Sequence, residues 1–323
     1  EKTLATSPPQ ATPAPPETVE RKAESYTCPK CSGRMVYQPT LGQLECTQCG
    51  HQTSVNLSQS KSDKSAIEFA LVAEAGHAWA RNHQQASCDN CGAVSMLPPT
   101  QKTNTCPYCG SNQLVSHQLD QDMIPPRSIL PFALDNDTAY QRFKRWLGSN
   151  FFAPDDLTNM AKNTALRQAY YPFWLFDATY HANYSVEINE GTNRNPRWVA
   201  HSGTEVLFYD DTLVPGNTRI TLDDLKGIEP FDLKGLIDYD AAVLAGWPAF
   251  MYDTPLADAA IRVRGKIADH ARPRLSRRIA AGRETRNLEI STGDFSSKTF
   301  KLVFMPLWVG VYNYNGQEYH VVV

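Results

Sequence analysis

The sequence predicts an α+β fold, in which two small cysteine-rich modules precede a larger, mostly antiparallel sheet with helices packed against it. Three observations lead to this fold class. All eight cysteines lie before residue 110, in two copies of one pattern. Runs of aromatic and β-branched residues dominate from Tyr170 onward, and Pro255 to Ala281 has the composition of a long helix. With 323 residues, 41% of them hydrophobic, the chain can bury a core of this size.

The cysteines form four Cys-x-x-Cys pairs. The first module contains Cys28, Cys31, Cys46 and Cys49, and the second contains Cys88, Cys91, Cys106 and Cys109. Fourteen residues separate the inner cysteines in each copy, and the second copy repeats the first after 60 residues. Two such turns can present four thiolates to one ion, and this spacing is typical of Zn²⁺ held in a zinc ribbon. We therefore expect two structural zinc sites with no open coordination position.

Disulfides, a redox dithiol and iron are the alternatives to zinc for these cysteines. Disulfides are disfavoured because the first 25 residues lack the apolar segment of a secretory signal, and reducing compartments keep thiols free. A redox dithiol would need a βαβ context, which these pairs lack. Iron would use the same four thiolates, so the choice between zinc and iron stays open.

A small residue is expected after the second cysteine of each pair, where the backbone turns under the sulfurs. Gly50, Gly92 and Gly110 fill this position, whereas the first pair is followed by Ser32 and its glycine comes one residue later.

Composition divides the chain into five segments. They are a disordered, Pro-rich leader (1–25), the first zinc ribbon (26–57), a linker helix (58–86), the second zinc ribbon (87–117) and an α+β domain (118–323). In the first ribbon, Met35–Tyr37 and Leu44–Glu45 are expected to pair around the turn Pro39–Gly42. In the linker, an apolar stripe over 64–83 predicts the helix.

The α+β domain begins with helices and continues mainly with strands. Asp135 or Asp137 can cap a helix that carries Phe143, and another short helix is expected at Pro154. The expected strands cover Tyr170–Val186, Arg197–Tyr209, Thr212–Val214, Asn287–Ile290, Lys298–Tyr314 and Gln317–Val323, with an Asn315-Gly316 turn between the last two. The helix from Pro255 to Ala281 is expected to bend or break at Pro273.

Two segments of the expected sheet echo each other. Tyr171-Pro172-Phe173-Trp174-Leu175 resembles Met305-Pro306-Leu307-Trp308-Val309, 134 residues later. Either the two descend from one unit or each begins a core strand. In both cases we expect Trp174 and Trp308 in the core.

The sequence names no reaction. A nucleophile elbow, a P-loop, a dinucleotide fingerprint and a His-Glu-x-x-His motif are all missing. His181, His201 and His320 lie in expected strands and are candidates for a catalytic site if the fold brings them together. The net charge of −3 excludes a globally basic nucleic-acid binder, and no run approaches 18 apolar residues.

Basic residues concentrate between Arg262 and Arg286, where nine Lys and Arg stand against two acidic residues. Such a segment can bind phosphate groups or anionic lipid, and the candidate contacts are Arg272, Arg274, Arg277 and Arg278. Alternatively, its charges are paired with acidic neighbours in the same domain. Aromatic residues are absent between Tyr252 and Phe295, so base stacking by this segment is not expected.

Taken in order, several stretches resemble a family of bacterial tandem zinc-ribbon proteins, described as having a TFIIB-type zinc ribbon and sometimes loosely labelled primosomal helicase-like. These stretches are CPKCSGRMVYQPTLGQLECTQCG, CDNCGAVSMLPPTQKTNTCPYCGS, IPPRSILPFALD, YYPFWLFDATYHANYS, DYDAAVLAGWPAFMYD and FKLVFMPLWVGVYNYNGQEYHVVV. The resemblance implies that the eight cysteines bind zinc. It also implies C-terminal transmembrane helices after the last strand, and partners similar to flotillin-like or PspA-like membrane-stress proteins. It offers no catalytic residue, and the missing Walker A motif excludes an ATP-driven motor.

Three functions follow as expectations. The leading one is a non-enzymatic adaptor or scaffold whose ribbons bind protein partners at the cytoplasmic face of a membrane, in a chain cut short before its membrane anchor. The alternative is a nucleic-acid-binding accessory protein that uses the ribbons and the Arg262–Arg286 segment. A third is an enzyme with its site in the C-terminal sheet domain.

Overall fold

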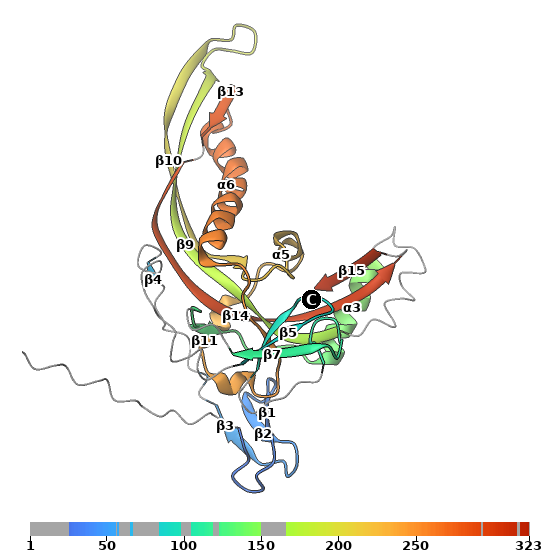
Figure 1. Cartoon of the computed structure of the whole chain (residues 1–323). Helices are drawn as coiled ribbons and strands as arrows, with labels where there is room; N and C mark the ends of the chain where they lie inside the picture. Colours follow the sequence, from blue (N-terminus) through green and yellow to red (C-terminus); the bar gives the residue numbers. More distant parts are fainter. Residues whose placement is uncertain are drawn as a thin grey trace, which may run out of the picture.

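The computed structural model describes residues 26–55, 57, 65–66, 84–97, 105–118, 123–149, 166–291, 293–314 and 317–322. Within these residues the chain has mixed α+β structure, with one small sheet, one large and mostly antiparallel sheet, and three α-helices. A long curved arm rises from a body, and the small sheet lies at the opposite end of the molecule (Figure 1). The predicted leader, the helix at Pro154 and most of the linker helix lie outside the described residues.

The small sheet belongs to the first cysteine module. It contains β1 (Met35–Gln38), β2 (Gln43–Cys46) and β3 (Gln52–Ser54), paired antiparallel in that order. The hairpin predicted around Pro39–Gly42 is confirmed, with Met35 opposite Cys46 and Gly42 at a φ of +63°. A left-handed backbone at this point suits glycine, which lacks the Cβ that would clash. The third strand was not predicted.

The large sheet contains all remaining strands. They are β4 (Ser65–Ala66), β5 (Gln84–Cys88), β6 (Val94–Leu97), β7 (Leu114–Gln118), β8 (Ser128–Ile129), β9 (Leu166–Asn189), β10 (Trp198–Pro215), β11 (Ile237–Asp238), β12 (Ala249–Phe250), β13 (Thr285–Ile290), β14 (Asp294–Tyr314) and β15 (Gln317–Val322). Its main path runs β11-β8-β14-β9-β12-β6-β5-β7, with β10 and β13 added on β9 and with β4 and β15 added on β14. Within the predicted linker helix (58–86), Ser65–Ala66 form β4 and residues 84–86 begin β5, so these residues are strand and not helix.

The two longest strands, β9 and β14, pair antiparallel at the centre of the sheet. Tyr171 lies opposite Met305, and these are the first residues of the two echoing segments. The two similar segments are therefore related by an approximate two-fold axis through the Tyr171–Met305 pair. The relation extends to the neighbours, because β12 runs parallel beside Tyr170 and β8 runs parallel beside Phe304, which are equivalent positions of the echo. Trp174 and Trp308 are buried in the core, as expected.

Three α-helices pack against strands of the large sheet. They are α3 (Asn136–Ser149), α5 (Leu222–Ile228) and α6 (Leu256–Ala280), with short 3₁₀ turns η1 (Leu233–Gly235) and η2 (Ala241–Leu244). Of the two predicted caps for α3, Asp135 is the one in use, since its carboxylate accepts the Thr138 N–H at 2.8 Å.

Helix α6 lies along the concave side of the arm (Figure 1). Its buried residues recur every three or four positions, as expected for an amphipathic helix, and pack with the inner face of β9 and β10. The helix is continuous through Pro273, so the alternative of a break there was wrong. Ala271 and Leu275 are buried on either side of Pro273, and this packing holds the adjacent turns against the sheet.

Candidate metal centres

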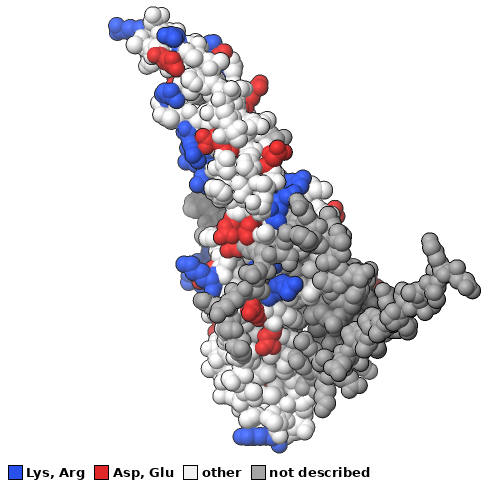
Figure 2. Space-filling model, turned by 90° about the vertical axis from the view of Figure 1, so that its left-hand side faces the viewer, with Lys and Arg blue, Asp and Glu red and all other residues white. Residues whose placement is uncertain are grey.

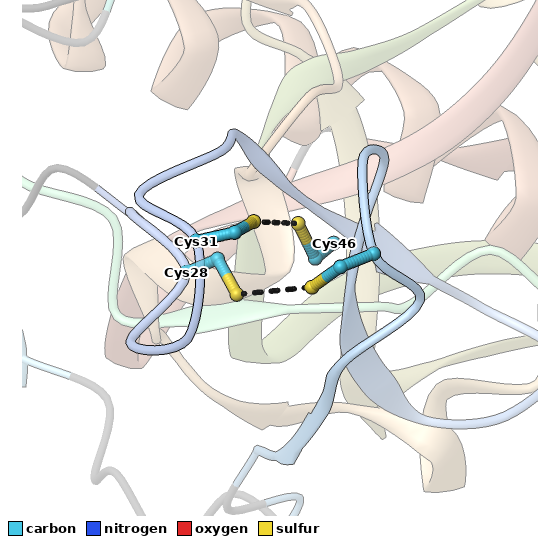
Figure 3. Close-up of side chains that lie close together, drawn as sticks. Cys28, Cys31 and Cys46 are labelled. Carbon is cyan, nitrogen blue, oxygen red and sulfur yellow. Dashed lines mark hydrogen bonds between the residues drawn. The ribbon is translucent and has the colours of Figure 1, made fainter.

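The first cysteine cluster joins two turns of the first module. The Cys28 and Cys49 sulfurs lie 3.6 Å apart, and those of Cys31 and Cys46 lie 3.5 Å apart. All four sulfurs lie within 4.8 Å of one another. Figure 3 shows the labelled side chains of this cluster pointing toward one another from the two turns.

The second cluster repeats this arrangement in the second module. Cys88 and Cys109 have sulfurs 3.7 Å apart, as do Cys91 and Cys106. The repeat extends to the main chain: the N–H of Gly50 donates to the Cys46 carbonyl at 3.0 Å, and that of Gly110 donates to the Cys106 carbonyl at 2.9 Å. The 60-residue repeat in the sequence is thus a repeat of local structure.

The predicted backbone turn under the sulfurs is present in both modules. Gly50, Gly92 and Gly110 have φ values of +68°, +69° and +77°. At the first turn the same place falls on Ser32, which adopts a φ of +58°. A residue with a Cβ is strained in this conformation, whereas glycine is not.

The donor set and its spacing fit a tetrahedral metal ion. The eight cysteines are free thiols, and their sulfurs lie far beyond the length of about 2.05 Å that a disulfide requires. Four thiolates at about 2.3 Å from one ion would be separated by about 3.8 Å, close to the distances in both clusters. Two four-cysteine groups therefore fit two metal sites. Each has all four positions supplied by the protein, which is typical of a structural site.

Main-chain N–H groups favour a thiolate at one position of the first site. Those of Cys49 and Gln48 lower the pKa of Cys46 to about 6. For Cys31 the Gly33 N–H also acts to lower the pKa, but the sulfurs of Cys49 and Cys46 outweigh it and raise the pKa to about 12. The thiols of this cluster therefore differ in how readily they lose a proton, and binding a metal would release the protons that remain.

The second site is more enclosed and has polar neighbours from distant parts of the chain. Burial acts to raise the pKa of Cys109, but the Ser111 N–H and the Asn90 side chain outweigh it and lower the pKa to about 7. The Arg167 guanidinium donates to the Cys106 carbonyl at 3.4 Å. Arg219 stacks over the Tyr108 ring at 5.4 Å.

These arginines were not predicted as parts of the site. A Cβ on Gly110 would lie within 2.6 Å of the Arg167 guanidinium, and a Cβ on Gly92 would lie 3.1 Å from that of Arg219. Two cations thus approach a cluster that would carry about two negative charges when four thiolates bind a divalent ion. No local sequence signal could have revealed them, because both belong to the α+β domain.

The two sites differ in exposure. Cys28, Cys46, Cys88 and Cys106 are buried, Cys91 and Cys109 are half-buried, and Cys31 and Cys49 are exposed. Each site thus has one side in the core and one side toward solvent, and the first is the more open.

The first module is docked on the loop after η2. The Tyr37 N–H donates to the Ala245 carbonyl at 2.8 Å, and the Trp247 indole donates to the Tyr37 carbonyl at 2.8 Å. Gly246 has a φ of +84°, and a Cβ there would lie 2.6 Å from Val36. A close main-chain approach therefore fixes this module to the body.

The second module is part of the large sheet itself. Strand β6 pairs with β12, and the Met251 N–H donates to the Val94 carbonyl at 2.9 Å. Tyr108 packs edge-on against Phe250, with ring centroids 6.5 Å apart. The second site therefore shares its core with the sheet.

The basic segment is divided between paired and unpaired residues. Lys266 binds Glu229 at 2.6 Å, Arg278 binds Glu205 at 3.0 Å, and Arg286 binds Glu187. The other three candidate phosphate contacts, Arg272, Arg274 and Arg277, are exposed and have no carboxylate partner within the described residues. On the face seen in Figure 2, basic and acidic side chains are interspersed along the arm.

The three candidate histidines are not brought together. His181 lies on β9 opposite Val206 and bonds Ser296 at 2.7 Å. His201 lies on β10, five residues before Val206, and bonds Glu190 at 3.1 Å. His320 is on β15, which pairs with β14 and with neither of these strands. The fold therefore does not join these three histidines in one site.

A group of three acidic residues shapes a β-bulge. Asp177, Asp210 and Asp211 have carboxylate oxygens within 4.8 Å of one another. They lie where the pairing of β10 with β9 shifts, and Asp211 has a φ of +55°. The Asp211 N–H donates to Asp177 at 2.9 Å, and Thr299 donates to Asp177 at 3.0 Å. The geometry of the bulge accounts for these residues.

The fold and the two cysteine clusters define an α+β protein with two candidate metal sites, in which both cysteine modules are fixed to one body. Among the helices that the structure describes, none is long and apolar enough to cross a membrane. The chain is 24% identical over 315 residues to the uncharacterized protein YdjG of Bacillus subtilis (strain 168), in an alignment that covers 91% of this chain and 85% of YdjG. No protein-family model matches the chain. No solved structure matches it either.

Proposed function

We propose that the protein is a non-enzymatic adaptor that binds protein partners through an exposed apolar turn of the first cysteine module, at the cytoplasmic face of a membrane. Zn²⁺ would occupy both cysteine sites and keep the modules folded. Four soft thiolates in a closed set suit this ion, and an ion with no open position would supply rigidity rather than chemistry. The resemblance to membrane-associated tandem zinc-ribbon proteins supports the location.

The exposed apolar turn of the first module, with Leu41 and Leu57 beside Gly42, carries the proposal. Leu41 and Leu57 are 55% and 39% exposed. They flank one turn, since a Cβ on Gly42 would lie 2.8 Å from Leu57. The end of the molecule that holds β1 to β3 has few charged side chains on the face seen in Figure 2. Exposed apolar side chains beside the turn of a metal-braced hairpin suit contact with another protein.

The test compares two exposed apolar positions. Proteins that co-purify with the chain from its cells of origin would be quantified for the wild type, for Leu41→Ser/Leu57→Ser and for the control Val115→Ser, which removes a 42% exposed valine from the second module. We expect the double variant to bind its main partner about tenfold or more weakly, because a few residues carry most of the binding energy of such contacts. Val115→Ser should retain it. Equal capture by all three proteins would contradict the proposal.

A second candidate is phosphate binding by α6, favoured by Arg272, Arg274 and Arg277, which have no carboxylate partner in the part of the chain that the structure describes. Changing these three residues to Gln should lower the affinity for labelled single-stranded nucleic acid and flatten its salt dependence. Arg278→Gln is the control, because Arg278 already binds Glu205. Fluorescence anisotropy at low and moderate salt measures both effects. Unchanged binding by the triple variant would remove this candidate.

A further inference from the structure

The outer edge of β10 is long, and no described strand pairs with it. Within the described residues, β10 pairs with β9 alone, and the pairing is regular from Trp198 to Tyr209, where the bulge interrupts it. Natural edge strands are commonly blunted by lysine, proline or a bulge. Between Trp198 and Phe208 the chain reads WVAHSGTEVLF, with neither lysine nor proline. This segment therefore lacks the usual devices against strand addition.

The hydrogen-bond pattern shows which residues face the open edge. The Glu190 N–H donates to the Arg197 carbonyl at 2.8 Å, whereas the Asn189 N–H turns away from β10 and donates to Glu284 at 3.0 Å. Antiparallel pairs alternate between bonded and non-bonded positions, so every second residue of β10 directs its main-chain groups outward. These outward residues are Trp198, Ala200, Ser202, Thr204, Val206 and Phe208.

The same residues place apolar side chains on the face away from α6. Leu207 is buried with the residues of α6. Its neighbours Val206 and Phe208 point to the opposite face and are exposed, and Phe208, at 79%, is the most exposed large hydrophobic residue in the described part of the chain. Free main-chain groups and exposed apolar side chains thus coincide on one edge.

We propose that this edge pairs antiparallel with the same edge of a second copy of the chain, about a two-fold axis at Gly203. Outward-facing residues have to meet outward-facing residues, so the axis passes through a residue and not between two. An axis at Gly203 uses the whole edge and places Phe208 opposite Trp198 of the second copy. It also places Glu205 opposite His201. An axis one residue away, at Thr204, would set Glu205 against glycine and bring Trp198 into the bulge.

The charges along this edge are complementary in the Gly203 register. Glu205 already binds Arg278, and His201 already bonds Glu190. Bringing Glu205 of one copy beside His201 of the other continues an alternation of basic and acidic groups, and no carboxylate faces another. Gly203 itself lies under Tyr184, whose hydroxyl would be 3.0 Å from an added Cβ. Glycine at the axis thus leaves room for the closest approach of the two strands.

The pairing would form about a dozen main-chain hydrogen bonds, a number typical of specific interfaces. The two arms would lie side by side and the two bodies at opposite ends. This dimer does not depend on the adaptor function, because it uses a different surface.

The experiment measures mass in solution by sedimentation over a concentration range of about a hundredfold. The full chain should approach twice the mass of one copy as concentration rises. Val206→Pro removes an outward N–H that the β9 ladder does not use, so we expect it to raise the dissociation constant about tenfold or more while the melting temperature stays close to that of the wild type. Val206→Thr keeps the N–H and is the matched control.

Hydrogen–deuterium exchange locates the contact. Amides of Ser202, Thr204 and Val206 should gain protection as the wild type is concentrated, and those of β13 should not. Phe208→Ser should weaken the dimer without lowering protection of the β9 ladder. A wild-type chain that stays monomeric, a Val206→Pro chain that still dimerises, or a dimer that protects other segments would each overturn the proposal.

Discussion

At the scale of single residues, Ser32 is the position where the two cysteine modules differ most clearly. Its counterpart Gly92 has the same left-handed backbone without a Cβ. We expect Ser32→Gly to stabilise the metal-loaded first module by up to about 1 kcal/mol, because the strain of a left-handed residue is relieved, although glycine also makes the unfolded chain more flexible. Chemical denaturation followed by near-ultraviolet circular dichroism measures the change. A destabilised Ser32→Gly protein would show that the serine side chain has a role of its own.

A second residue-scale prediction concerns Arg167. Its guanidinium contacts the Cys106 carbonyl and lies against Gly110. Arg167→Gln removes a nearby positive charge, so we expect metal release from the second site to accelerate about tenfold or more. Transfer of metal to a chromogenic chelator measures the rate, and release from the first site in the same protein is the internal control. Equal acceleration at both sites would point to general destabilisation instead.

The ligands could be predicted from the sequence because they are local. Cysteine spacing and the following glycines carry the whole signal for both clusters. Arg167 and Arg219 could not be predicted, since their approach to the second site depends on how the large sheet closes around Tyr108. The same limit applies to the histidines, which lie in the expected strands but at separate places in the sheet.

At the scale of elements, α6 makes a direct prediction. The helix passes through Pro273 without a break, so the folded state lacks one helical hydrogen bond and accommodates the proline ring. We expect Pro273→Ala to raise the free energy of unfolding by about 1 kcal/mol or more, since alanine restores the missing N–H and has far higher helix propensity. Thermal unfolding measures it. A neutral or destabilising effect would mean that proline rigidity in the unfolded chain outweighs the helix term.

Long elements were predicted well, whereas the two-residue strands were not. Strands β9 and β14 and helix α6 have patterns that extend over many residues, and these patterns are visible in the sequence. Strands β8 and β12 contain two residues each, and nothing local distinguishes them from loops. They form only because β14 and β9 offer edges beside them, which is a tertiary effect.

At the scale of the whole molecule, the two metal sites should differ in how much they stabilise the body. The first module packs its core side chains against the body and docks on the loop at Gly246, but its strands form a separate sheet, whereas β6 of the second module lies within the large sheet. We expect Cys91→Ser to lower the melting temperature of the whole chain and Cys31→Ser to leave the main transition nearly unchanged. Tryptophan fluorescence reports the body, and elemental analysis should find about two metal ions in the wild type and about one in each variant. Equal losses of stability would contradict this difference.

The hydrogen bond from Trp247 to Tyr37 joins residues 210 positions apart, and this separation orders events during synthesis. At about 5–20 residues per second, the docking loop leaves the ribosome on the order of 10–40 s after the first module does. A segment of that size is too small to fold on its own apolar surface, so only bound metal can hold it together during this interval. The first module is therefore expected to acquire its ion before its place on the body exists, and the supply of metal at the ribosome becomes a condition for assembling the chain.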